Sequence, residues 1–473
     1  MKYKYFSSIV LLIILVPIMQ GQNNSTIIVN AQHVDAASHA SALSSVFNQF
    51  QAISLNAKQI YAQVNSAEFD NEMIWSLGDQ EFRIFLYAHD IRHPDYQLQV
   101  LTDNGVTSID PGPSYTYRGH NIDNPAHQVR MTITPNSIAG FMSNEQGEQW
   151  YLQAAGDFSK SAGFSVLYRA KDVKSDPNRT CASSHLHDQS TSPPGNGAGH
   201  ARSSACKLAQ VAIAADYSMY TKYGSVSALQ THLLSVKNMM EANYSTFNVD
   251  FSVVTTFVNT SSSQSPWTTS TSSGLLLNSF SCWAGDGSSS QLGCSGENGF
   301  GVSHDVGELW SNRDFDGPSV NTVGLAWINS VCYAMYKYSV VQHYTTNLES
   351  LRVLIAHECG HNFGSGHTTS GYIMAPSVNP SATQFSSTAQ SAINSALTNF
   401  SCLGSCGGSG CASSMTVTSA SATGLKQASN SITTSGTINL NGTATYDAPN
   451  VSLNASFSVN PGSILEIKSQ GCN

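Results

Sequence analysis

Charged residues are scarce in this chain of 473 residues, because Asp, Glu, Lys and Arg together make up only 11% of it. The net charge is -9 and no basic run occurs, so the phosphate contacts of a nucleic-acid-binding protein are not available. Long apolar runs are also missing after the first residues. The hydrophobic fraction of 41% still permits packed cores. We therefore expect roughly two to four globular domains, no nucleic-acid partner and no membrane span.

The N-terminus has the one long apolar run. A basic start at Lys2 and Lys4 precedes apolar residues from about Phe6 to Met19, and a polar exit follows. The run is shorter than the roughly 20 residues that cross a bilayer. We therefore interpret residues 1–21 as a secretory signal peptide rather than a membrane anchor. Secretion into the extracellular space makes the cysteines candidates for disulfides.

No cysteine occurs before Cys181, although the chain has 10. The preceding segment has loosely helical spacing from Ala36 to Val64, whereas Arg83–Ala88 and Val129–Ala139 alternate like strands. This pattern predicts an α+β unit over residues 22–203. Its last part, about 174–203, is rich in Ser, Gly and Pro and reads as a linker.

The chemistry is concentrated in an eleven-residue stretch that begins at His357. His357 and His361 are four residues apart, so on a helix both imidazoles point from one face and can share a zinc ion. Glu358 follows the first histidine and is the candidate general base. Gly364 permits the turn that ends the helix, and His367 returns as a third ligand. Three protein ligands leave the fourth zinc position open for water, as in catalytic sites.

A methionine turn follows this motif, with Met374 between Gly371 and Pro376. The long zinc motif and the turn together resemble the metzincin metallopeptidases. Several further segments resemble the adamalysin (reprolysin, ADAM-type) group, and the resemblance covers roughly residues 206–403. These segments are the strand that ends in Ala215-Asp216, His304–Trp310, Phe315-Asp316-Gly317 and Val323–Ile328.

The resemblance implies an α/β metalloprotease domain over residues 204–403, with a twisted mixed sheet, a long zinc-binding helix and the Met-turn. It also implies an edge strand containing Gly324, Leu325 and Ala326, which would hold an extended peptide substrate antiparallel to itself. Residues 22–203 would then be a propeptide that keeps the enzyme latent, and the alternative is an independent substrate- or surface-binding domain. Maturation is expected near Arg202 if the activating protease is trypsin-like.

Cys181 matches the position of a cysteine switch, in which a propeptide thiolate fills the open zinc position. Its neighbours Thr180 and Ala182 differ from the residues that usually flank such a switch, and an ordinary disulfide cysteine is the alternative. The family's structural Ca²⁺ is a second implied ion. Gln210 lies near the position where the family has a glutamate ligand, which weighs against that site. The chain also has Thr368 where adamalysins have an aspartate directly after the third histidine.

The remaining cysteines suggest a set of bridges. Cys282 and Cys294 flank a Gly/Ser loop and could form a local disulfide. The resemblance pairs Cys332 with Cys402, and Cys359 in the zinc helix is the candidate for an unpaired, buried thiol. A tight bridge between Cys406 and Cys411 is also considered. The zinc helix itself is expected to begin with a capping box, Thr346 at the cap and Glu349 three residues later.

The C-terminal part consists of a hinge at residues 404–414 and a segment at 415–473 with short alternating runs between Gly and Asn turns. We expect a small β-rich module there, for surface or substrate attachment or for export sorting. The whole pattern predicts a secreted zinc endopeptidase. The alternatives are a catalytically silent binding protein with this fold and a zinc hydrolase of a non-peptide substrate. The oligomeric state stays open.

Overall fold

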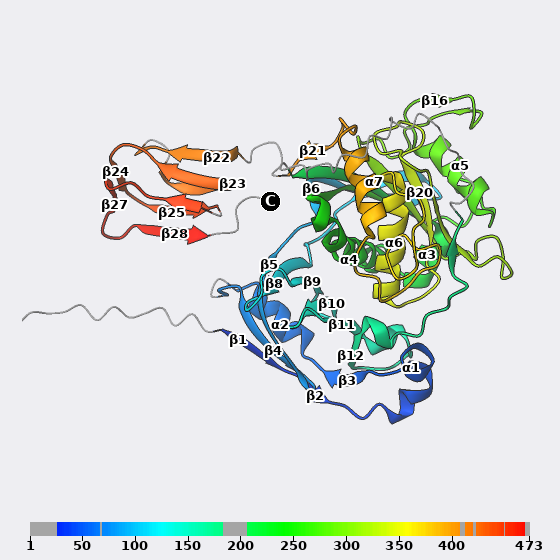
Figure 1. Ribbon diagram of the computed structural model, residues 1–473, viewed down its shortest axis with the longest axis horizontal. Coiled ribbons are helices and arrows are strands. Elements are labelled where there is room, and N and C mark those ends of the chain that lie inside the picture. The colour runs from blue at the N-terminus through cyan, green and yellow to red at the C-terminus, as the bar shows by residue number, and fades with distance from the viewer. Residues whose placement is uncertain are drawn as a thin grey trace, which may run out of the picture.

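The computed structural model describes residues 26–66, 69–182, 206–406, 412–419, 422–448 and 450–468. The predicted signal peptide, most of the predicted linker with Arg202, and the centre of the predicted hinge lie outside these ranges. Figure 1 shows three parts: an N-terminal unit (residues 26–182), a central unit (206–406) and a C-terminal module (412–468). Within the described residues no helix has the length and apolar character needed to cross a membrane.

A ten-stranded sheet forms the N-terminal unit, and all neighbours in it are antiparallel except β1 and β4. Two short helices accompany it, α1 (Ala40–Val46) and α2 (Ala57–Val64). In spatial order the strands are β1 (Ile27–Asn30), β4 (Glu72–Leu77), β5 (Gln80–Ala88), β8 (Thr116–Asn121), β9 (Gln128–Ile133), β10 (Ile138–Ser143), β11 (Gln149–Ala154), β12 (Ser165–Arg169), β3 (Gln51–Ser54) and β2 (Gln32–His33).

Two predictions for this unit need correction. The single strand expected at Val129–Ala139 is wrong, because β9 and β10 form a hairpin there. The Thr134 hydroxyl accepts from the backbone N–H groups of Asn136 and Ser137, which closes the turn. The continuous helical pattern expected from Ala36 to Val64 is also interrupted, since β3 separates α1 from α2. Tertiary pairing overrides loose helical spacing in this second case.

The central unit is built on a mixed sheet whose main strands are parallel. Strands β6 and β7 and the two-residue β13 come from the N-terminal part of the chain, and β21 pairs with β14. In spatial order the strands are β13 (Thr180-Cys181), β19 (Thr322–Ala326), β20 (Tyr338–Gln342), β18 (Val306–Ser311), β14 (Lys207–Ala215), β15 (Val249–Asn259), β6 (Arg92–Thr102) and β7 (Gly105–Ile109), with β21 at Gly404-Ser405.

The helices cover both faces of this sheet because its strands are apolar on both sides, as in a buried parallel sheet. Val211 and Ile213 of β14 belong to one core, shared with the helices α4, α6 and α7. Ala212 and Ala214 point to the other core, shared with α5. The helices are α3 (Tyr217–Tyr223), α4 (Val226–Tyr244), α5 (Ser273–Ala284), α6 (Leu348–Asn362) and α7 (Ser387–Leu397).

The C-terminal module pairs its strands in parallel, around a core that includes Ile432, Ile438, Leu440 and Tyr446. Its largest sheet has the path β22-β23-β25-β28. The strands are β22 (Ala412–Val417), β23 (Gly424–Thr434), β24 (Ile438–Leu440), β25 (Thr443–Asp447), β26 (Asn450–Ser452), β27 (Phe457–Val459) and β28 (Ile464–Lys468).

Three disulfides stabilise the central unit. The predicted pairs Cys282–Cys294 and Cys332–Cys402 are confirmed, and Cys359 is buried and unpaired as expected. The pairing of Cys406 with Cys411 is wrong, because Cys406 is bonded to Cys206. The physical reason is that β21 pairs antiparallel with the start of β14, which brings the two Cα atoms to 5.2 Å.

The burial of His343 in the central unit predicts that the folded protein loses stability at acidic pH. His343 is 3% exposed and its Nε2 accepts from the Tyr223 hydroxyl at 2.9 Å. Burial, with a contribution from Lys222, lowers the pKa of His343 from 6.5 to about 3. The folded state therefore disfavours protonation, so this stability is complete above pH 6.5 and is lost as the pH falls from 6.5 toward 3.

We expect this histidine alone to remove about 1 kcal/mol of the free energy of unfolding between about pH 6.5 and 5.5. Thermal unfolding of wild type and His343→Gln over this pH range checks it, because the variant should lose less stability. His33, whose side chain is 60% exposed, provides the control His33→Gln. Equal pH slopes for all three proteins would contradict the prediction.

Candidate metal centre and active site

Helix α6 carries the central residues of the site, and all of its fifteen residues are buried. The predicted cap at Thr346 is wrong, because Asn347 caps the helix with its side-chain oxygen accepting from the Ser350 N–H at 3.0 Å. Glu349 does not close a capping box, since both of its carboxyl oxygens are buried without a hydrogen-bond partner. Burial raises the pKa of Glu349 well above its usual range and so favours the neutral form of this carboxyl. A helix packed on every side holds its side chains in fixed directions.

The two histidines of the helix are oriented by backbone carbonyls. His357 Nδ1 donates to the Ile373 carbonyl and His361 Nδ1 donates to the Ser365 carbonyl, each at 2.7 Å. These bonds place the proton on Nδ1 and leave the lone pair on Nε2. The two Nε2 atoms lie 3.0 Å apart, so both lone pairs are directed at one point.

The third histidine reaches the same point after the turn that follows the helix. Gly364 has φ +98°, which side chains other than glycine rarely adopt, and a Cβ there would lie 2.8 Å from the Ala396 Cβ. His367 follows, and its Nε2 is buried without a hydrogen-bond partner. The Thr368 N–H then donates to the Met374 carbonyl at 2.8 Å, closing the short loop that leads to the methionine turn.

These residues fit a zinc ion. The ligand atoms of His357, His361, His367 and Cys181 all lie within 4.8 Å of one another. Burial holds the pKa of His361 well below its usual range and lowers that of His357 to about 3, so both imidazoles are neutral. Neutral imidazole nitrogens and a cysteine sulfur are preferred zinc donors. The bare Nε2 of His367 is a buried polar atom that a metal ion would satisfy.

Glu358 lies beside this cluster and under strand β19. Its side chain is fully buried, and burial raises the pKa of its carboxyl to about 8. Gly324 makes room for it, because a Cβ at that position would lie 2.1 Å from Glu358 Oε1. Because Gly324 has no side chain, the Glu358 carboxylate can occupy this position beside β19.

Met374 lies on the opposite side of the zinc helix from this strand. It is fully buried, and a Cβ at Gly360 would come within 2.4 Å of its sulfur. The methionine turn therefore packs directly on the helix turn between His357 and His361. Glycine is needed at position 360 for this close approach. The contact positions the methionine turn against the helix, and that turn supplies the Ile373 carbonyl to His357.

The segment around Cys181 lies against these residues. The Cys181 sulfur lies 3.5 Å from Glu358 Oε2 and 3.5 Å from His361 Nε2. Backbone bonds hold the segment on both sides: Cys181 N–H donates to the Pro376 carbonyl and Ala182 N–H donates to the Gly324 carbonyl. Strand β19 is therefore not a free edge, because β13 pairs with it in parallel.

Sequence reasoning missed one residue that organises the site. Asn362 is fully buried directly after His361, and its side-chain amide donates to the carbonyls of Trp327 and Tyr338 and to the Ser330 hydroxyl. These bonds tie the end of the zinc helix to the loop beyond β19. A single polar residue on a helix gives no local signal of such distant partners.

The comparisons with known proteins agree with this geometry. Residues 205–386 match the model Reprolysin_5, described as metallo-peptidase family M12. A zinc metalloproteinase-disintegrin-like protein of Cerberus rynchops is 23% identical over 299 residues. That match covers 60% of this chain and 45% of the relative, so the chain spans less than half of the relative's length.

The fold and the three converging histidines define a metallopeptidase domain. Over residues 205–386 the chain is similar to the M12 metallopeptidases of the reprolysin (adamalysin) type.

Proposed function

We propose that this protein is a secreted zinc-dependent endopeptidase of the metzincin group, made as a latent precursor. The observation that carries the proposal is the convergence of His357, His361 and His367 beside the buried Glu358, at the edge of the sheet. The three disulfides of the central unit agree with an oxidising, extracellular location.

Three histidines would hold the metal and Glu358 would move the proton. Zinc, when bound, supplies a Lewis acid that polarises the scissile carbonyl and makes water more acidic. Glu358 accepts a proton from the attacking water and delivers it to the nitrogen of the departing amine. Its raised pKa suits both roles, since the carboxyl can gain and lose a proton near neutral pH. Met374 takes no proton and provides the apolar support under the helix.

Strand β19 supports an extended peptide as the substrate. Gly324, Leu325 and Ala326 are paired with β20 on one side, and the other side is occupied by the Cys181 segment. When that segment leaves, its backbone partners at Asn321, Gly324 and Pro376 become available to another chain. A row of backbone partners favours peptides over small esters or amides as substrates.

Cys181 would keep the precursor latent. Its sulfur stands within reach of the histidine cluster and also against Glu358, so it blocks both the open metal position and the general base. The segment runs parallel to β19, whereas a substrate is expected antiparallel. This reversed direction distinguishes the blocking segment from a substrate.

The test uses the full chain, cut by a site-specific protease whose recognition sequence is placed between Gly195 and Asn196. Bound zinc per molecule and hydrolysis of unfolded casein are measured, with small esters and amides as alternative substrates. We expect about one zinc per chain, casein hydrolysis, and loss of hydrolysis after chelation. Zinc without any hydrolysis would favour the silent binding protein, and hydrolysis of esters alone would favour a non-peptide substrate. If the cut protein bound no zinc, the proposal would be contradicted.

The contact between Gly324 and Glu358 yields a separate prediction. In Gly324→Ala the new methyl group would meet Glu358 Oε1, so the carboxylate must shift by on the order of 1 Å. A displacement of that size lowers kcat by about a hundredfold. We expect unchanged zinc content, because the three histidines do not contact Gly324. Gly274→Ala, at a glycine with open space around it, is the control and should keep full activity.

A further inference from the structure

Besides the two-residue β13, the N-terminal unit contributes two strands, β6 and β7, to the sheet of the central unit. Strand β6 runs parallel to β15, with residues Gln97–Leu101 in register with Thr255–Asn259, and β7 covers β6 on the outside. Side chains reinforce the pairing, since the hydroxyl of Thr255 donates to the Gln97 carbonyl and that of Thr260 to the Leu101 carbonyl. Removal of the N-terminal unit would leave β15 with an unpaired edge from Val253 to Asn259.

The hydrophobic core also crosses from one unit to the other. Phe141, Tyr151 and Tyr168 of the N-terminal sheet belong to the same cluster of buried side chains as Leu233 and Met239 of α4. The opposite face of the N-terminal sheet has a core of its own, packed on α2. One face of that sheet is therefore apolar surface that the central unit covers together with Leu43 and Phe47 of the N-terminal unit itself.

Buried polar groups cross the same boundary. Asn238 of α4 is fully buried, and its amide donates to the carbonyls of Tyr117 in β8 and Met131 in β9, both at 3.2 Å. These two carbonyls lie in the N-terminal unit. Without the N-terminal unit, the Asn238 amide would lose both partners.

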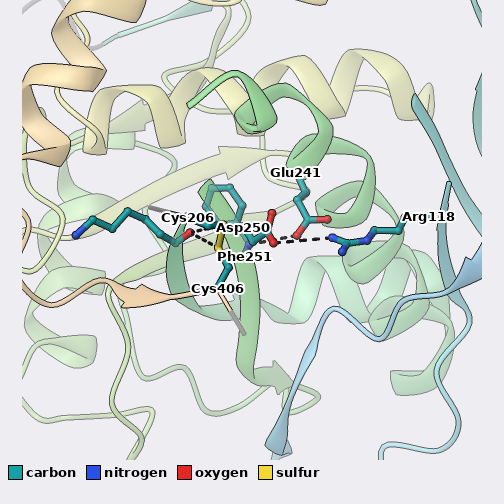
Figure 2. The surroundings of a disulfide bond; sticks show 7 residues. Arg118, Cys206, Glu241, Asp250, Phe251 and Cys406 are labelled. Atoms are coloured by element: carbon teal, nitrogen blue, oxygen red, sulfur yellow. Dashed lines mark hydrogen bonds and ion pairs between the residues drawn. A yellow bond between two sulfur atoms is a disulfide. The ribbon is translucent and has the colours of Figure 1, made fainter. Parts of the chain in front are cut away.

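Acidic side chains of α4 and β15 also face basic side chains of the N-terminal unit. Glu241 is 1% exposed; His89 lies 3.1 Å from its carboxylate and Arg130 lies 3.8 Å away. Figure 2 shows Arg118 of β8 reaching toward Asp250, at 3.9 Å, beside the disulfide of the central unit. Although burial alone would raise the pKa of Glu241, the basic residues His89, Arg130 and Arg118 hold it well below its usual range. All three residues belong to the N-terminal unit.

The blocking segment is held much less firmly. Residues 179–182 lie at the opposite end of the sheet from β6, and four backbone bonds attach them: Thr180 to Asn321, Cys181 to Pro376, Ala182 to Gly324 and Val378 to Arg179. Cys181 is the buried side chain of the segment and Ala182 packs against the core of the central unit, while the Cys181 sulfur contacts Glu358 and His361. Its release and the release of the whole unit are therefore separate events.

We propose that the N-terminal unit is not shed when the connecting segment is cut, and that it remains a permanent non-covalent part of the mature protein. Strands β6 and β7 complete the catalytic sheet, and only the segment that carries Cys181 leaves the histidine cluster. This inference rests on the proposed function, because the cut between residues 182 and 206 is taken as the maturation step. The partner that fits the exposed edge of β15 and the acidic residues Glu241 of α4 and Asp250 of β15 is thus the chain's own N-terminal fragment.

The experiment is size-exclusion chromatography of the cut protein described above, diluted to nanomolar concentration at physiological ionic strength. We expect both fragments to elute together and casein hydrolysis to coincide with that peak. Separate elution of the two fragments, or activity found only where the N-terminal fragment is missing, would overturn the proposal. Co-elution with no hydrolysis and no zinc would leave this inference standing and would instead remove the proposed function.

Charge variants sharpen the test. The double substitution Arg118→Met with Arg130→Met removes two of the cations that face Glu241 and Asp250, and we expect at least a tenfold weaker association of the cut fragments. Arg83→Met is the matched control, because Arg83 forms an exposed ion pair with Asp123 inside the N-terminal unit. Equal association of the double variant and the control would show that the buried charges do not hold the interface. Wild-type co-elution decides the proposal even where the double variant does not fold.

Discussion

Replacing Glu358 with alanine should lower kcat for casein by about a thousandfold, within the range expected for loss of a general base. Glu358 Oε2 lies 3.5 Å from the Cys181 sulfur, and its Oε1 is buried without a hydrogen-bond partner among the described residues. Zinc content should stay unchanged, because the glutamate is not one of the converging ligands. Steady-state hydrolysis and metal analysis of the cut protein measure both quantities.

The matched control is Glu349→Gln on the same helix. Glu349 is also fully buried, but burial favours the neutral form of its carboxyl, so the neutral glutamine should leave activity close to wild type. If Glu358→Ala retained wild-type kcat, the general base would have to be another group. If both variants lost activity and zinc together, the effect would be one of helix packing and not of proton transfer.

Replacing Cys181 with serine should activate the uncut chain. The thiol lies 3.5 Å from His361 Nε2 and Glu358 Oε2, and a serine hydroxyl is a much poorer metal ligand. A loss of only about 1.4 kcal/mol in the attachment of the segment raises the open fraction about tenfold. We therefore expect at least about tenfold more casein hydrolysis by the uncut variant than by the uncut wild type.

Cys359→Ser provides the comparison, since Cys359 is also a buried cysteine outside any disulfide, one residue after Glu358. Its surroundings are Tyr244 and Lys237 and not the histidine cluster. This variant should stay latent until it is cut. Equal activation by both serine variants, or silence of Cys181→Ser with zinc bound, would argue against a switch at Cys181.

The local features of the site could be predicted because each of them depends on residues that are close together in the sequence. The four-residue interval of His357 and His361 places both on one helix face, and Gly364 has the positive φ that a helix-ending turn requires. The loop disulfide between Cys282 and Cys294 is of the same kind. Such features depend on geometry that a few neighbouring residues determine by themselves.

Features that join distant segments left no signal in the sequence. The pairing of β6 with β15 connects residues about 160 positions apart, and a strand's alternation does not reveal which sheet it joins. The role of Gly324 as space for Glu358 and the bond of Cys406 to Cys206 depend in the same way on the assembled sheet. The cap at Asn347 was missed for a smaller reason, because two adjacent polar residues can both cap a helix and packing selects one.

The disulfide between Cys206 and Cys406 has a mechanical consequence. It joins the first and the last described residue of the central unit. Tension that is applied to the central unit along the chain at residues 206 and 406 enters at one of these cysteines and leaves at the other. The covalent bond carries that tension directly, so neither the sheet nor the zinc helix is stretched. A protein held to a surface through its C-terminal module could thus be pulled without distortion of its metal site, and reduction of this one bond would direct the same pull through the metal site.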